Sequence, residues 1–63
     1  MIKYFLLNEN DERVEEFFAY SDIAIEYGVT RGVIAGKFNR AHKKGSNIIS
    51  IEKDRIIQIR ENN

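Results

Sequence analysis

The chain has 63 residues, ten of them basic and ten acidic, with one histidine, no cysteine and no proline, and its net charge at pH 7 is zero. This length predicts a single domain, 1–63, with a small core, and the lack of cysteine excludes disulfides and thiolate metal sites. No apolar run is long enough to span a membrane. The N-terminal apolar segment is too short and too soon acidic for a signal peptide, so we expect a cytoplasmic protein with no membrane partner.

The first predicted element is a β-hairpin. Ile2–Leu7 (IKYFLL) is rich in residues that favour strands, and NENDE from Asn8 to Glu12 is typical of a turn. Arg13–Phe18 (RVEEFF) then returns as a second strand. The alternative is a helix capped by Asn10 or Asp11, because the apolar residues of this segment also fall at helical spacing. Periodicity over so short a segment does not separate the two, and we favour the hairpin.

The next stretch, Tyr20–Gly45, predicts two helices joined by a tight turn, with the helix-turn-helix itself at about 21–44. Ser21 is the expected N-cap of a short first helix. Gly28 ends this helix, because glycine adopts the left-handed conformation without steric cost. Thr30 then caps the second helix.

The second helix, about 30–43, has one apolar stripe. Ile34, Phe38 and Ala41 recur at spacings of four and three, so we expect them to face the core, with Val33 at the border of the stripe. The residues left facing outward are Arg31, Gly32, Ala35, Gly36, Asn39, Arg40 and Lys43. Gly32 and Gly36 lie one turn apart and would let a DNA backbone or another helix approach closely. The alternative is that they pack against the following hairpin.

The spacing in this segment resembles that of helix-turn-helix DNA-binding domains, which place a small residue in the first helix, a glycine at the turn and two apolar residues after it. Ala24, Gly28, Val29 and Ile34 stand in these places. With the run GVTRGVI, they make residues 20–60 similar to the excisionase-like and MerR-type winged domains of phage and plasmid proteins. A strand, an acidic turn and a strand before a helix also resemble the small DNA-binding modules attached to homing nucleases. Lys37 departs from the pattern, which often has an apolar residue there, and Phe38 can do that packing instead.

After Gly45, SNIISIEKDRIIQIR predicts a second β-hairpin, with strands at 47–52 and 55–60 joined at Lys53-Asp54. The residues expected on its buried face are Ile49, Ile51, Ile57 and Ile59. Ile48 and Ile56 would lie on the other face, where they cover a second surface or form a small apolar patch usable in dimerisation. A helix from Ser50 or Asp54 to Glu61 is the competing assignment.

By resemblance to winged helices, this hairpin, at about 47–60, is the wing, and its tip near Lys53 and Arg55 would meet the DNA backbone. The predicted fold is therefore α+β, a small helix-turn-helix core with a C-terminal β-hairpin wing. Its N-terminal flank is a β-hairpin, or a single strand if 13–18 is helical.

Charge is distributed unevenly along the chain. Residues 1–26 carry two basic and seven acidic side chains, a net charge of −5, whereas residues 27–51 carry five basic and no acidic side chains, a net charge of +5. This asymmetry is expected when one face of a protein meets phosphates and the opposite face does not. The plainer interpretation is that a solvated helix face often carries several lysines.

Together with the resemblance, these features imply a protein that binds double-stranded DNA sequence-specifically. It would be a small phage- or plasmid-type transcriptional regulator or an excisionase-like factor, in the cytoplasm or nucleoid of a bacterial cell. The residues expected to contact base edges in the major groove are Arg31, Lys37, Asn39 and Arg40. Those expected to contact DNA phosphates are Thr30, His42, Lys43, Lys44, Lys53 and Arg55. Because one copy offers a small interface, a homodimer or a cooperative oligomer on DNA is expected.

The sequence offers little for catalysis. His42 is the only histidine, and adjacent acidic residues such as Glu15 and Glu16 do not converge from different elements. We therefore expect no enzymatic activity, no cofactor and no metal site. The alternative function is a protein-interaction module, for example a small phage protein that binds a host factor through exposed isoleucines and an acidic N-terminal hairpin containing Glu9, Asp11 and Glu12.

Overall fold

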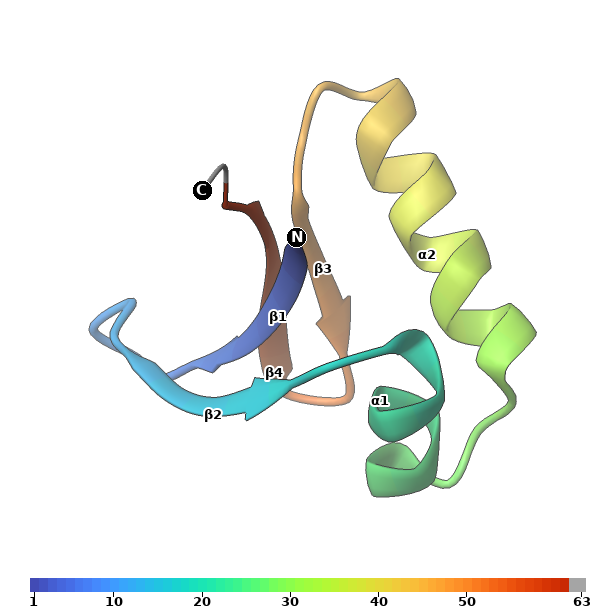
Figure 1. Ribbon diagram of the computed structural model, residues 1–63, viewed down its shortest axis with the longest axis horizontal. Coiled ribbons are helices and arrows are strands. Elements are labelled where there is room, and N and C mark those ends of the chain that lie inside the picture. Colours follow the sequence, from blue (N-terminus) through green and yellow to red (C-terminus); the bar gives the residue numbers. More distant parts are fainter. Residues whose placement is uncertain (62–63) are drawn as a thin grey trace.

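Two β-hairpins combine into one antiparallel sheet with the strand order β2-β1-β4-β3 (Figure 1). The computed structural model describes residues 1–61 and has the strands β1 (Ile2–Leu7), β2 (Arg13–Phe17), β3 (Ile48–Ile51) and β4 (Asp54–Arg60). Both predicted hairpins are confirmed, and the helical alternatives for 13–18 and for 54–61 are wrong. The central strands β1 and β4 also pair with each other along their whole length, a pairing that the sequence did not predict.

The helices cover one face of this sheet, and the side chains that point to that face form the core. Tyr4, Phe17, Ile49, Ile51 and Ile56 of the sheet are all buried there. The α+β prediction is thus confirmed, with a helix-turn-helix flanked by a hairpin on each side.

The prediction of which isoleucines of the second hairpin are buried is confirmed for Ile49 and Ile51 of β3 and wrong for those of β4. Ile56 is fully buried, whereas Ile57 and Ile59 are only partly buried on the other face of the sheet. The strands join at Glu52-Lys53, one residue before the predicted Lys53-Asp54, and this two-residue turn sets Ile49 directly opposite Ile56. Because directly opposite residues point to the same face, Ile56 joins Ile49 in the core. The patch predicted from Ile48 and Ile56 does not form.

The first helix, α1 (Tyr20–Tyr27), begins two residues earlier than the predicted cap implies. Its N-cap is Ala19, which makes no side-chain capping bond, so the prediction that Ser21 is the cap is wrong. Asp22 instead makes the side-chain hydrogen bond at this end of the helix: its carboxylate accepts from the Phe18 backbone N–H over 3.2 Å. Including Tyr20 in the helix brings its ring against the core aromatics.

The turn between the helices has the predicted structure. Gly28 has the left-handed φ of 65° and ends α1, and the Val29 N–H donates to the Ala24 carbonyl over 3.0 Å. Thr30 caps α2 (Arg31–Lys43) by accepting a hydrogen bond from the Val33 N–H at 3.3 Å.

The core between helices and sheet is centred on a cluster of aromatic side chains. Tyr4, Tyr20 and Phe38 lie with their ring centroids 5.3–5.4 Å from one another. Each such pair adds about 0.5–1.5 kcal/mol to the free energy of unfolding beyond the burial of its area. Phe38 and Ile34 are fully buried and Ala41 packs against them, as the spacing of α2 predicts. The cluster therefore fixes the rotation of α2 about its own axis.

Candidate nucleic-acid interface

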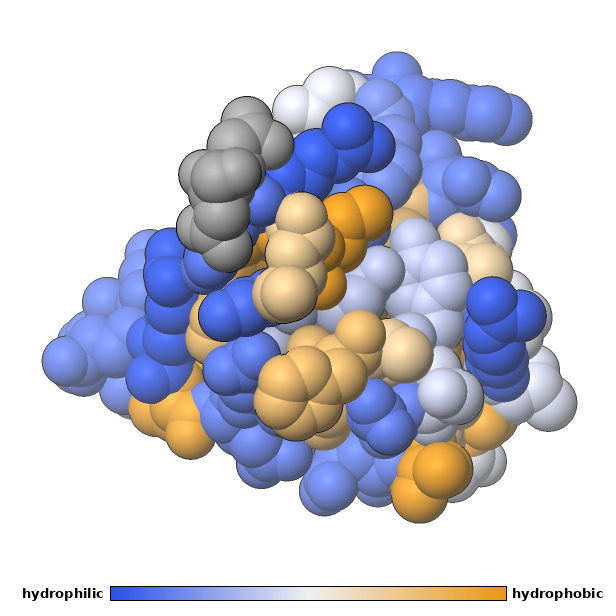
Figure 2. Space-filling view, viewed as in Figure 1, coloured by the Kyte–Doolittle hydropathy of each residue, from blue (hydrophilic) through white to orange (hydrophobic). Residues whose placement is uncertain are grey.

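The core packing of α2 determines which of its side chains meet solvent. Because Ile34 and Phe38 are fully buried, the opposite side of the helix faces outward. Ala35 and Gly36, also predicted to face outward, are only partly exposed, whereas the other predicted residues are exposed as expected: Arg31, Gly32, Asn39, Arg40 and Lys43. Figure 2 shows a mainly hydrophilic surface over α2, and the hydrophobic side chains in this view lie in separate groups.

The two glycines of α2 leave no side chain of their own on its outer face. A Cβ atom on Gly32 would meet only the Thr30 Oγ1, at 3.9 Å, and one on Gly36 would meet only the Arg40 Nη1, at 3.4 Å. Neither glycine packs against the C-terminal hairpin, so that alternative is wrong. The side chain of Arg40 instead folds back over Gly36, so the backbone of α2 is open to a close approach from outside at Gly32 and is covered by Arg40 at Gly36.

A basic groove separates one flank of α2 from strand β3, which lies beside it in Figure 1. We call it the α2–β3 groove. It has a volume of about 310 Å³ and is lined by Lys37, Arg40, Ala41, Lys44, Ser46, Ile48, Ile49 and Ser50. Three of these side chains are cations and none is a carboxylate. The groove therefore favours an anionic occupant.

The other flank of α2 turns toward β1 and β4. His42 Nε2 lies 2.7 Å from Gln58 Oε1, and the Gln58 amide donates to the Tyr4 hydroxyl over 3.4 Å. Near the start of the helix, burial raises the pKa of Tyr20, with Tyr4 adding to the effect, while the positive charge of Arg31 acts in the opposite direction. The structure thus places Arg31 and His42 on a different flank from the groove cations.

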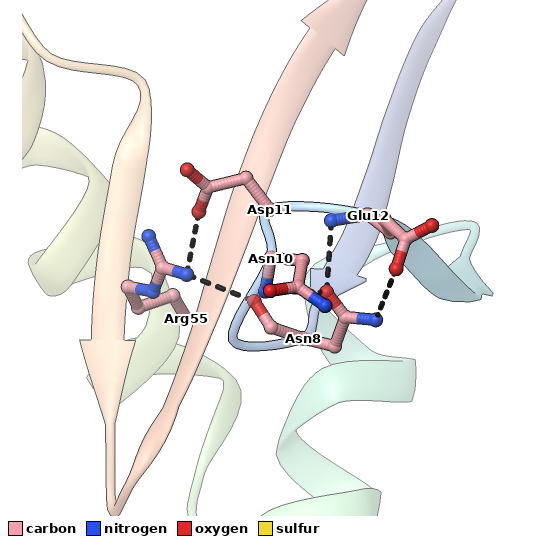
Figure 3. Close-up of polar contacts among 5 residues, drawn as sticks. All are labelled: Asn8, Asn10, Asp11, Glu12 and Arg55. Atoms are coloured by element: carbon pink, nitrogen blue, oxygen red, sulfur yellow. Dashed lines mark hydrogen bonds and ion pairs between the residues drawn. The ribbon is translucent and has the colours of Figure 1, made fainter.

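Arg55 is bound to the loop of the first hairpin (Figure 3). Its Nη2 lies 2.6 Å from Asp11 Oδ1 and donates to the Asn8 carbonyl over 2.9 Å. The loop presents these two oxygens because the Asn8 side chain accepts from the backbone N–H groups of Asn10 and Glu12, each over 2.9 Å. Arg55 is therefore engaged within the protein itself, unlike the cations of α2.

The turn that carries Lys53 lies far from the basic end of α2. Figure 1 shows the β3–β4 turn beside α1, at the opposite end of the molecule from the C-terminus of α2. Lys53 is exposed, and it lines a surface hollow with Asn8 and Glu9 of the acidic loop. The predicted phosphate contacts thus fall into two separate groups, with Lys43 and Lys44 in one and Lys53 in the other.

The positive charges of α2 have no acidic partner in the fold. The ion pairs among residues 1–61 are Lys3 with Glu61, at 3.6 Å, and Arg55 with Asp11. Neither involves α2, so no acidic side chain of residues 1–61 pairs with the five cations of this segment, which are Arg31, Lys37, Arg40, Lys43 and Lys44.

Sequence reasoning missed three features of this surface. The two serines of the α2–β3 groove, Ser46 and Ser50, follow only from the pairing of β3 with β4. The sequence does signal the bracing of Arg55, because an asparagine that begins a turn commonly accepts from the N–H two residues later, as Asn8 does. The high exposure of Phe18 and Ile25, 73% and 80%, has no signal in the sequence.

Comparison of the chain with protein-family models, with curated proteins and with solved structures gives no match. No cluster of acidic and histidine side chains suited to a metal ion occurs among the residues that the structure describes. Within 1–61, neither helix has the length and apolar character needed to cross a membrane. The candidate function therefore rests on the geometry and charge of α2 and its surroundings.

Proposed function

We propose that the chain binds double-stranded DNA by inserting α2 into the major groove. The observation that carries the proposal is that α2 and the residue after it hold five cations, four of them exposed and Lys37 partly buried, and that no carboxylate of residues 1–61 pairs with any of them. Duplex DNA is the partner whose charge matches such a helix, because each neutralised phosphate releases bound counterions and so favours binding.

The outer face of α2 has the groups that read base edges. Arg31 and Arg40 can donate to guanine, Asn39 can pair with adenine, and Lys37 borders the same surface. Gly32 lets the start of the helix lie deep in the groove. Phosphates would be held by Lys43 and Lys44, with Thr30 and His42 at the edges. Lys53 is left out, because the β3–β4 turn that carries it lies far from the basic end of α2. Arg55 is left out of this set, because Asp11 already neutralises it.

The expected oligomeric state follows from the small size of the interface. One α2 helix offers a contact comparable to a single DNA-binding module of roughly 600–1,000 Å², so useful affinity calls for a homodimer or a cooperative oligomer on repeated sites. The protein would act in the cytoplasm or nucleoid of a bacterial cell, as a small transcriptional regulator or an excisionase-like factor.

The test is binding to a random-sequence duplex across a salt series, followed by fluorescence anisotropy. We expect log K to fall with log salt by about 0.9 per phosphate neutralised, and the double variant Arg40→Glu/Lys43→Glu to lose binding. The matched control is Arg13→Glu/Arg60→Glu, which makes the same change in net charge on β2 and β4 and should bind like the wild type apart from a small long-range effect. Lack of binding at low salt, or an equal loss in the control, would contradict the proposal.

A second candidate is a protein-docking surface on α1, favoured by one observation. Phe18 and Ile25 are the most exposed large apolar side chains after residue 1, and Asp22 and Glu26 beside them are acidic and exposed. The acidic loop is a poorer docking surface than the sequence suggested, because Asp11 is paired with Arg55. A partner that binds the wild type and Arg40→Glu/Lys43→Glu but not Ile25→Asp would support this function. A partner that tolerates Ile25→Asp would argue against it.

A further inference from the structure

The pairing of β3 with β4 determines which backbone groups of β3 face the α2–β3 groove. Ile49 is opposite Ile56, Ile51 is opposite Asp54 across the two-residue turn, and the Gln58 N–H donates to the Asn47 carbonyl over 2.8 Å. In an antiparallel pair, hydrogen-bonded positions alternate along each strand. The backbone groups of 47, 49 and 51 therefore point to β4, and those of 48 and 50 point away from the sheet.

The two outward N–H groups differ in their partners. The N–H of Ile48 donates to the Ser46 hydroxyl over 3.1 Å. The N–H of Ser50 has no acceptor among the hydrogen bonds of residues 1–61, and Ser50 is an exposed residue that lines the α2–β3 groove. An unpaired N–H is thus present on the strand edge that borders three cations.

The groove cations are spaced so that an extended anion could meet more than one of them. Lys37 and Lys44 lie seven residues apart, which is roughly 10 Å along a helix axis. Arg40 lies between them along α2, and no carboxylate lines the groove. A backbone N–H together with Lys and Arg side chains is the donor set that proteins use for DNA phosphates.

We propose that one DNA strand runs along the α2–β3 groove, with a phosphate oxygen accepting from the Ser50 N–H while Lys37, Arg40 and Lys44 neutralise that phosphate and its neighbours. This rests on the proposed function and specifies it further. The edge of β3 then makes the contact with the DNA backbone that the sequence predicted for the hairpin tip at Lys53 and Arg55. It also fixes which flank of α2 faces the sugar-phosphate backbone. Lys37 and Arg40, which line the groove, then move from the base-reading set to the phosphates, and Arg31 and Asn39 are left toward the bases.

The variant that tests the proposal is Ser50→Pro, because proline lacks the N–H and leaves every charge in place. A strand edge tolerates proline where the N–H points away from the ladder, and Ile49 before it is already extended, as a residue before proline prefers. We expect the affinity for a random-sequence duplex to fall about tenfold, as for a lost hydrogen bond to a charged group. The slope of log K against log salt should not change, because no cation is removed.

Two control variants separate the N–H from the other groups at this place. Ser50→Ala keeps the N–H and should bind like the wild type. Lys44→Gln should lower the salt slope by about 0.9, as expected for one phosphate contact. If Ser50→Pro and Ser50→Ala bind equally well while Arg40→Glu/Lys43→Glu does not bind, the strand-edge contact is absent and the proposed function stands.

Amide hydrogen exchange measured by NMR on the wild-type protein tests the same contact without a folding risk. The Ser50 amide should exchange rapidly in the free protein and slowly in the duplex complex. Rapid exchange in a complex that still shows a steep salt dependence would overturn the inference. Equal protection by polyglutamate would make the groove a general polyanion site and would also overturn it. Absence of duplex binding would remove the proposed function and the inference together.

Discussion

At the scale of single residues, Tyr27 connects α1 to the C-terminal hairpin. Its hydroxyl donates to the Asp54 carboxylate over 2.7 Å. Burial raises the pKa of Tyr27 well above its ordinary value, and the hydrogen bond to Asp54 and the negative charge of that carboxylate raise it further. Since the neutral phenol is the bonded form, the folded state holds this proton more tightly than the unfolded state.

The raised pKa of Tyr27 predicts how stability depends on alkaline pH. Its contribution to the free energy of unfolding is fully present below the unfolded pKa of about 10 and is lost as pH rises above it. Tyr27→Phe should lower the free energy of unfolding at neutral pH by about 1–2 kcal/mol and should remove this part of the alkaline decline. Urea unfolding at neutral pH and at about pH 9 to 11 measures both effects. Tyr20→Phe, which leaves the Asp54 bond intact, should retain the Tyr27 contribution, and equal curves for wild type and Tyr27→Phe would refute the assignment.

At the scale of elements, the sequence predicts what local chemistry determines. Gly28 and Thr30 end and begin helices by their own conformation and hydrogen bonds, so the turn is found where the sequence places it. The burial of Ile56 depends instead on the register of β3 and β4. One residue more or fewer in the turn would place Ile56 on the opposite face of the sheet. Pairing of β1 with β4 joins segments about fifty residues apart, and no local pattern predicts it. The α2–β3 groove depends on how strands and helices that are apart in the sequence pack together, and no local pattern predicts it.

The outer glycines of α2 lead to a prediction for stability and binding together. Gly32 has open space around its Cα, so Gly32→Ala should raise the free energy of unfolding by about 1 kcal/mol, the difference in helix propensity. If α2 enters the major groove by this face, the added methyl group should weaken duplex binding. Urea unfolding and anisotropy on the same variant measure the two effects.

The matched control for Gly32→Ala is Ser21→Ala, at an exposed position in the first turn of α1. It should leave duplex binding unchanged. If Gly32→Ala is more stable and binds DNA as tightly as the wild type, this face of α2 is not the one that meets the duplex.

At the scale of the whole molecule, the fold pairs some basic side chains with acidic ones and leaves those of α2 without such a pair among residues 1–61. The chain is neutral overall, yet the cations of α2 form no ion pair within the described residues 1–61, while Arg55 of β4 lies against the acidic loop. This sorting follows from the β1–β4 pairing, which brings Leu7, the residue before the loop, opposite Arg55. The acidic N-terminal half therefore neutralises a cation of the hairpin and none of α2. Net charge alone hides this arrangement.

This sorting predicts that two substitutions with the same change in charge have different effects on DNA binding. Arg55→Gln should leave the affinity for duplex DNA and its salt slope almost unchanged, because Asp11 already screens the guanidinium from a distant phosphate. It should instead lower the free energy of unfolding by up to about 1 kcal/mol, as for an exposed ion pair. Lys44→Gln should do the reverse, lowering the salt slope by about 0.9 with little effect on stability. A salt series and urea unfolding on both variants decide the matter, and equal losses of affinity would mean that overall charge, and not the surface of α2, holds the DNA.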